Sequence, residues 1–353
     1  MRLDKKTKIL KVCVRNLLII AGLFSLLTSF SELVQATEMP FTVKTIVPDN
    51  QIDKRKTFFN LQVKPSQQQI ITANLTNTTS QDVTIKVNVN SAKTNANGVI
   101  EYGETNIRAD KSLEYAIPDL VKYPSEVKIS ANSSKEVLFH ITMPKKKYNG
   151  IILGGIVFQQ KESRISPSVK GTSIQNHYAY AVALSLKESD NQVSPNLNLL
   201  KVSPGQNNAR NVISAQIQND KSILLSKVKV SAKVYAKGAK TPVYTSVTTD
   251  MQIAPNSNFK YPISLNGTEM KPGNYTLKMS VTGTAYVTPK TWYFTKNFKI
   301  KSAEASSLNK SDVDIKANTN NNNLIFILVG LLLLLIVTIL IIIIIRQNKK
   351  LKK

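Results

Sequence analysis

The residue types that most often perform chemistry are scarce in this sequence. There is one cysteine, Cys13, and there are two histidines, His140 and His177. This count excludes a cysteine-ligated zinc site, an iron–sulfur cluster and a multi-histidine metal centre. His140 lies in a segment of alternating polar and apolar residues, which predicts a strand side chain instead of a catalytic base. His177 has no nucleophile motif around it.

A pair of carboxylates could hydrolyse a glycan, because glycosidases place two acids across the bond that they cleave. Glu101 and Glu104 are the one pair that invites this interpretation, and a solvated loop accounts for them better. The sequence contains no glycine-rich phosphate loop, dinucleotide fingerprint or calcium-binding loop. We therefore predict that the protein is not an enzyme and uses neither a metal nor a cofactor.

The strongest chemical signal is positive charge. The 353-residue chain has 47 Lys and Arg against 22 Asp and Glu, which gives a formal net charge of +25. Residues 191–301 hold 15 of these cations and only three acids, Asp220, Asp250 and Glu269. A section this basic attracts polyanions.

Part of this charge follows one predicted strand. Even intervals separate Lys227, Lys229, Lys233 and Lys237, which predicts that they share one strand face. This lysine stripe is a candidate binding site for teichoic acid, an anionic host glycan or an acidic protein. A lysine row that protects a sheet edge from aggregation is the alternative. Nucleic acid is a poor candidate partner, because no aromatic stacking motif interleaves with the lysines.

Both ends of the chain carry membrane signals. Residues 1–36 combine a basic region, an apolar stretch and small residues before a predicted cleavage after Ala36, as a secretory signal peptide does. Residues 324–345 carry no charge and correspond to about 33 Å of helix, which predicts a transmembrane helix. The cations of residues 346–353 predict a cytoplasmic tail. We therefore expect a single-pass protein of the cell membrane with its body outside.

Between these signals the sequence predicts an all-β fold, with two tandem immunoglobulin-like β-sandwich domains at 37–190 and 191–301 besides the one C-terminal transmembrane helix. Three segments alternate polar and apolar residues as half-buried strands do: 83–89, 228–236 and 292–300. Residues 302–323 are rich in serine and asparagine, which predicts a flexible stalk.

The two sections repeat one plan. Two pairs of segments correspond, 63–77 with 202–219 and 130–133 with 254–257. The segment around Tyr275 is typical of a tyrosine corner, in which the tyrosine hydroxyl bonds back to the chain at the edge of a sandwich. An ordinary exposed turn tyrosine is the alternative.

Several motifs, taken in order, resemble one family. They are Phe41-Thr42-Val43, Pro48-Asp49-Asn50-Gln51, the segment from Phe59 to Pro65, the segment from Thr94 to Gly98, and the segment from Gly150 to Phe158. This pattern resembles the WxL-interacting proteins of Gram-positive bacteria, and the resemblance covers nearly the whole chain. One departure is Ser66, where the family usually has glycine, and it puts the local turn geometry in doubt.

The resemblance implies a function. It implies an N-terminal domain that binds peptidoglycan and a C-terminal domain that binds a host component, in a protein found alongside surface proteins with a WxL wall-binding domain. We therefore expect a membrane-anchored adaptor whose partners are peptidoglycan and a WxL-domain surface protein or host ligand, with an anionic wall polymer as a further candidate. Two alternatives remain: an extracytoplasmic chaperone for secreted wall proteins that acts by strand addition, and a cell-wall hydrolase.

Overall fold

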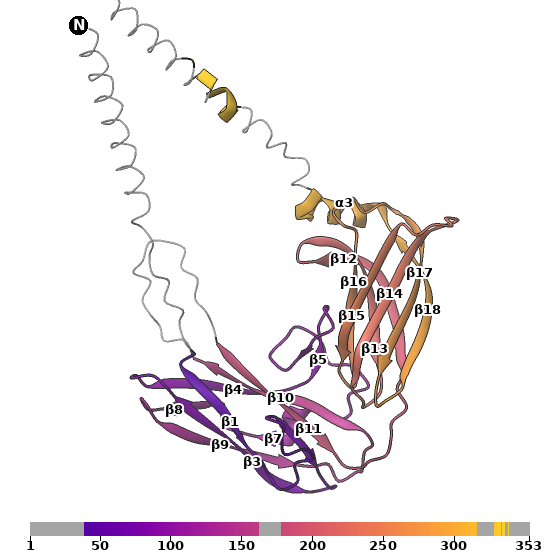
Figure 1. The fold of residues 1–353 in the computed structure, drawn as a ribbon. Coiled ribbons are helices and arrows are strands. Elements are labelled where there is room, and N and C mark those ends of the chain that lie inside the picture. Colours follow the sequence, from indigo (N-terminus) through magenta and orange to yellow (C-terminus); the bar gives the residue numbers. More distant parts are fainter. Residues whose placement is uncertain (1–38, 162–177, 316–327, 333, 336–337, 339–353) are drawn as a thin grey trace, which may run out of the picture. The chain divides into compact units, whose positions relative to one another are not determined.

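The computed structural model describes residues 39–161, 178–315, 328–332, 334–335 and 338. The chain divides into two compact units, residues 1–40 and 41–353. The predicted signal peptide, 1–36, lies outside the described residues. The second unit contains two β-domains in succession, which we call the first domain (residues 41–190) and the second domain (residues 191–315) (Figure 1).

The first domain consists of two sheets. One has the order β1-β3-β9-β7, with β1 at Phe41–Ile46, β3 at Gln68–Asn77, β9 at Ser134–Thr142 and β7 at Val121–Lys122. The other has the order β2-β11-β10-β4-β8, with β2 at Phe59–Gln62, β11 at Ala179–Lys187, β10 at Ile151–Gln160, β4 at Val83–Ser91 and β8 at Glu126–Ile129. Between β4 and β8 the chain also forms the hairpin of β5 (Lys93–Thr94) and β6 (Ile100–Glu101) and a single helical turn, α2 (Ile117–Leu120).

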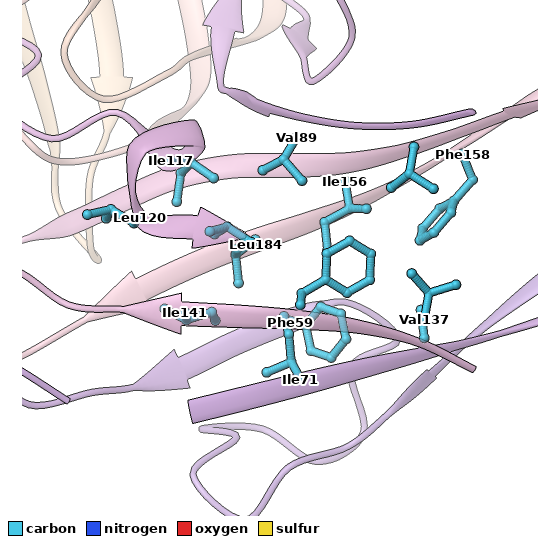
Figure 2. Packing of buried hydrophobic residues seen from close by; sticks show 14 of the residues in the cluster. Phe59, Ile71, Val89, Ile117, Leu120, Val137, Ile141, Ile156, Phe158 and Leu184 are labelled. Carbon is cyan, nitrogen blue, oxygen red and sulfur yellow. The ribbon is translucent and has the colours of Figure 1, made fainter. Parts of the chain in front are cut away.

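Alternation of side chains along these strands builds the core. In β4 every second residue, from Val83 to Val89, is buried, as the predicted strand at 83–89 requires. These valines and Ile85 form one cluster with residues of the facing sheet. Figure 2 shows Ile71 of β3 and Phe158 of β10 pointing into this cluster. Burial of each such large apolar side chain contributes about 1.5–3 kcal/mol, so this layer of contacts holds the two sheets together.

The second domain also has two sheets. One has the order β12-β13-β16, with β12 at Leu197–Asn207, β13 at Arg210–Asn219 and β16 at Ser257–Ser264. The other has the order β15-β14-β17-β18, with β15 at Tyr244–Ile253, β14 at Leu225–Ala236, β17 at Gly273–Thr284 and β18 at Pro289–Ile300. Their facing residues form a second core cluster, which includes Ile217, Val230, Leu277 and Trp292. The predicted strands at 228–236 and 292–300 are confirmed within β14 and β18.

The two domains share one pairing plan. Six strands of each domain correspond and pair with the same neighbours. Strand β3 corresponds to β13, β4 to β14, β8 to β15, β9 to β16, β10 to β17 and β11 to β18. Asn77 and Asn219 end β3 and β13, and both are buried. The Asn77 side chain donates to the carbonyl of Ser130 at 2.9 Å, and the Asn219 side chain donates to the carbonyl of Ala254 at 3.0 Å. The internal repeat read from the sequence is therefore confirmed.

Two turns clarify points that the sequence left open. The Tyr275 hydroxyl donates to the carbonyl of Lys271 at 2.9 Å, and the residue is buried, so the tyrosine corner is confirmed and the exposed turn tyrosine is wrong. Ser66 has a φ of 61°. This left-handed conformation suits the glycine that the family usually has, so Ser66 keeps the turn at a cost in backbone strain.

The predicted flexible stalk, 302–323, is wrong over its first part. Residues Ser302–Ser311 form α3, and Ala305 on this helix is buried in the core of the second domain. The Asp312 carboxylate, which is 1% exposed, accepts a hydrogen bond from the backbone N–H of Asn211 at 2.7 Å. The polar composition of this segment led to the wrong prediction, because a helix needs only a narrow stripe of apolar residues to dock on a domain. Residues 316–323 lie outside the described residues.

Of the helices within the described residues, none is both long and apolar enough to span a membrane. The segment predicted to do so, 324–345, is described only at 328–332, 334–335 and 338, and the tail at 346–353 lies outside the description. The signal peptide and the transmembrane helix stay predictions.

Candidate binding surfaces

The residues considered for catalysis are dispersed over the first domain. His140 lies on β9 with its side chain exposed, opposite Ile70 of β3 and Lys122 of β7. Glu101 ends β6 and accepts a hydrogen bond from the Asn95 side chain at 2.7 Å. Within the described parts of the chain, no group of three or more His, Cys, Asp or Glu is placed to hold a metal ion. His177 lies outside the description.

The lysine stripe is exposed but less regular than predicted. The side chains of Lys227, Lys229, Lys233 and Lys237 all face solvent. Lys227, however, has a φ of 48° and lies in a β-bulge, where the register shifts between Leu225 and Val228. Lys237 follows the end of β14. The even-interval rule therefore holds only for Lys229 and Lys233, which lie on either side of the buried Val230 and Ala232. Of these two lysines, Lys233 lies in the regular part of the strand, whereas the register with β15 shifts between Val228 and Val230, at Lys229.

The position of β14 in its sheet tests the edge-protection interpretation of the stripe, while the binding role stays a prediction. Lysines that protect a sheet from edge-to-edge aggregation lie on edge strands. Strand β14 is an interior strand, paired to β15 on one side and β17 on the other. The edge-protection interpretation is therefore wrong for Lys229 and Lys233.

Sequence reasoning missed the neighbours that complete this surface. Lys233 lies directly opposite Lys278 of β17, and Lys278 in turn lies opposite Thr295 of β18. The Lys278 Nζ lies 5.4 Å from the centre of the Tyr235 ring. Alternation along 273–284 and 289–300 would have placed Lys278 and Thr295 on outward faces, but only the strand register shows that they are neighbours.

A second polar surface joins the two domains. The insertion between β4 and β8 places Thr94 against the start of β16, where its Oγ1 accepts a hydrogen bond from the Ala254 N–H at 2.9 Å and lies 3.0 Å from Ser257 Oγ. The backbone N–H of Gln252 donates to the Gly98 carbonyl at 2.7 Å. Gly98 has a φ of 72°, and a Cβ there would overlap the Met251 side chain. Only glycine allows this close approach.

Asp110 is the charged centre of this junction. Its carboxylate is 7% exposed and accepts hydrogen bonds from the Gln218 side chain at 2.8 Å, the Asn258 side chain at 2.6 Å and the Ser112 N–H at 2.9 Å. Burial alone would raise the pKa of Asp110, but the hydrogen bonds from Ser112, Gln218 and Asn258 outweigh it and hold the pKa below its ordinary value. The carboxylate is therefore a charged anchor between the insertion and strands β13 and β16 of the second domain.

Two family models match most of the chain. Residues 41–160 match the model described as WxL Interacting Protein, peptidoglycan binding domain. Residues 169–310 match the model described as WxL Interacting Protein, host binding domain. The second match extends over most of α3, in agreement with the docking of that helix on the second domain. No curated protein matches the sequence.

Several solved structures have distant similarity. A chain from the chaperone–tip adhesin complex of CFA/I fimbriae is 12% identical, with 73% of this chain and 98% of that chain covered and a TM-score of 0.30. The YadV chaperone is 12% identical over 74% of this chain and 100% of its own, with a TM-score of 0.28. The CupB2 chaperone of Pseudomonas aeruginosa is 11% identical over 66% of this chain and 95% of its own, with a TM-score of 0.29. TM-scores this low support no conclusion about function.

Proposed function

Because this chain belongs to the WxL-interacting protein family, we propose that it is a membrane-anchored surface adaptor without catalytic activity. Its first domain binds peptidoglycan, and its second domain binds a WxL-domain surface protein or a host component. The observation that carries this proposal is the order of the two family matches, a peptidoglycan-binding domain at 41–160 followed by a host-binding domain at 169–310.

The charges of the two domains support different ligands for each domain. Residues 37–190 have 19 Lys and Arg against 14 Asp and Glu, whereas residues 191–301 have 15 against three. A nearly balanced first domain has little scope for purely ionic attachment to the wall. The basic second domain favours an anionic ligand or an acidic partner surface.

The fold and the apolar C-terminal segment support an anchored surface protein. We assign both domains to the immunoglobulin-like class because they share one antiparallel pairing plan and the second contains a tyrosine corner at the start of β17. The apolar segment 324–345 and the cations that follow it support an anchor in the cell membrane with both domains outside. Replacement of residues 331–335 by polar residues should then release the protein into the medium, and its retention in the membrane fraction would contradict the anchor.

The experiment for the wall-binding role is co-sedimentation of the full-length protein, in a neutral detergent, with purified peptidoglycan. At 0.5 M salt the Debye length is only about 4–5 Å, so exposed ionic contacts contribute little. We expect binding to persist at this salt, and to persist in a variant in which Lys227, Lys229, Lys233 and Lys237 are all changed to glutamine.

Two results would contradict this role. Loss of sedimentation at high salt would show that the attachment is ionic, and loss in the quadruple variant would assign wall binding to the basic second domain. Release of soluble peptidoglycan fragments during the incubation would show turnover and would refute a purely binding function.

A further inference from the structure

The outward face of the sheet β15-β14-β17-β18 forms a regular grid of side chains. The strand register aligns two transverse rows on it. One row is Thr245–Lys233–Lys278–Thr295, and the next is Val247–Ser231–Ser280–Tyr293. We call these residues, with Lys229, Thr282 and Thr291 beside them, the Tyr293 face.

The Tyr293 face carries an excess of positive charge, with Asp250 in the part of β15 opposite Lys229, where the register shifts between Val228 and Val230. None of the salt bridges between described residues involves Lys229, Lys233 or Lys278. Asp250, at the irregular end of β15, is the only acidic residue on the four strands of this sheet. Lys233 and Lys278 are directly opposed on neighbouring strands, an arrangement that destabilises a sheet through repulsion between like charges. An anion placed between them would remove this repulsion.

The same face carries apolar surface that the core does not use. Tyr293 is 82% exposed and Val247 is 63% exposed, at the two ends of one row. Between them lie the hydroxyls of Ser231 and Ser280. In the next row, Thr282 Oγ1 lies 2.8 Å from Thr291 Oγ1. A surface of lysines, hydroxyls and an unpacked aromatic ring offers ionic, hydrogen-bonding and stacking contacts within neighbouring rows of residues.

From this combination we infer that the Tyr293 face binds a sulfated glycosaminoglycan. This inference rests on the proposed host-binding role of the second domain. The sulfates and carboxylates of such a chain meet Lys229, Lys233 and Lys278, and the apolar side of a sugar ring stacks on Tyr293. An extended chain can lie across several strands without a deep pocket. A polyol phosphate chain such as teichoic acid would satisfy the lysines, but its backbone has no sugar ring to stack on the tyrosine.

The test uses the full-length protein in neutral detergent micelles and a fluorescently labelled heparin octasaccharide. Binding is followed by fluorescence anisotropy from 0.05 to 0.4 M NaCl. The double variant Lys233→Gln with Lys278→Gln should lose about tenfold in affinity at 0.1 M salt and show a shallower salt dependence, because fewer counterions are exchanged. The control variant Lys260→Gln removes an exposed lysine from β16, in the other sheet, and should bind as the unmodified protein does.

Tyr293 separates recognition of a sugar from attraction of charge. Tyr293→Ala should lose about tenfold in affinity with an unchanged salt slope, by analogy with the stacking of bases on aromatic side chains. Tyr293→Phe keeps the ring and should bind normally. Because this side chain is exposed, circular dichroism and the melting temperature of both variants should match those of the unmodified protein.

Three outcomes would overturn the inference. They are unchanged heparin binding in the double lysine variant, an equal loss in Lys260→Gln, and tighter binding of glycerol phosphate teichoic acid than of heparin. If heparin does not bind while peptidoglycan co-sedimentation succeeds, the ligand assignment fails and the adaptor function stands. If peptidoglycan does not bind either, the proposed function fails as well.

Discussion

The change Asp312→Asn should release α3 from the second domain. The two carboxylate oxygens of Asp312 accept three backbone hydrogen bonds, from Asn211 at 2.7 Å, Asp314 at 2.8 Å and Ile315 at 3.2 Å. Asp312 Oδ2 accepts the hydrogen bond from Asn211, and Oδ1 accepts those from Asp314 and Ile315. An asparagine has one acceptor oxygen and one NH₂ group, so in either orientation its NH₂ faces a backbone N–H.

The expected loss of stability of α3 follows from the number of hydrogen bonds that the substitution removes. The better orientation of the amide keeps the bonds from Asp314 and Ile315 and loses the one from Asn211. The loss of a hydrogen bond to a buried charged acceptor costs about 1.5–3 kcal/mol. The N–H of Asn211 is buried and gains no water in exchange. We therefore expect the free energy of local opening of α3 to fall by about 2–3 kcal/mol.

Hydrogen–deuterium exchange of the full-length protein measures this opening. A decrease of 2–3 kcal/mol corresponds to exchange that is about 30- to 150-fold faster in the peptide covering 302–315. The matched control is Asp314→Asn, which breaks the half-exposed ion pair with Arg210 at 2.9 Å. Such pairs contribute about 0.2–1 kcal/mol, so the control should change exchange by less than about fivefold. Equal effects of the two substitutions would refute the reasoning.

The protonation of Asp312 should act in the same direction as the substitution. Burial alone would raise the pKa of Asp312, but the hydrogen bonds from Asn211, Ile315 and Asp314 outweigh it and lower the pKa. A lowered native pKa means that the stabilisation is complete above the unfolded pKa of about 4. It is lost as the pH falls below that value toward the native pKa. Protection of α3 that stayed constant from pH 7 to pH 3 would contradict this.

Three further substitutions test contacts that hold separate parts of the fold together. Asp110→Asn should lower the free energy of opening at the domain junction by about 2 kcal/mol, because an NH₂ would face the amide donors of β13 and β16; faster hydrogen exchange in those two strands is the readout. Gly98→Ala should lower the melting temperature more than Gly238→Ala does, because both have a positive φ but only Gly98 has a neighbouring side chain in the way. Lys296→Met should lower the free energy of unfolding by about 1–2 kcal/mol, because the Lys296 ammonium donates to two carbonyls at the bulge of β12. The control Lys299→Met, at an exposed position, should lower it by less than about 0.5 kcal/mol; thermal unfolding measures both.

Alternation predicted the strands because their burial is local. Strand β14 has one face on the core, so residues such as Val230 and Val234 show their period in any window of the sequence. The tyrosine corner was predictable for the same reason, because Tyr275 and its acceptor Lys271 are four residues apart. Features that one short segment determines are visible without the rest of the chain.

The candidate site was predictable only in part. The exposure of Lys229 and Lys233 follows from alternation, but the bulge at Lys227 does not, because the extra residue depends on how β14 pairs with β15. Lys278 and Tyr293 lie 45 and 60 positions beyond Lys233 in the numbering, and only the register of three strands brings them together. Long-range register is set by the packing of whole sheets, which no local pattern reports.

The internal repeat explains why the domain junction was invisible in the sequence. In the second domain β14 and β15 are joined by a short turn, residues 237–243, whereas the equivalent β4 and β8 are separated by residues 92–125. This insertion supplies Thr94, Gly98 and Asp110, which all contact the second domain. Because the repeat predicts only what the domains share, it cannot align the residues of this insertion. Much of the junction therefore arises from a departure from the common plan, and substitutions there should affect the coupling of the domains before they affect either core.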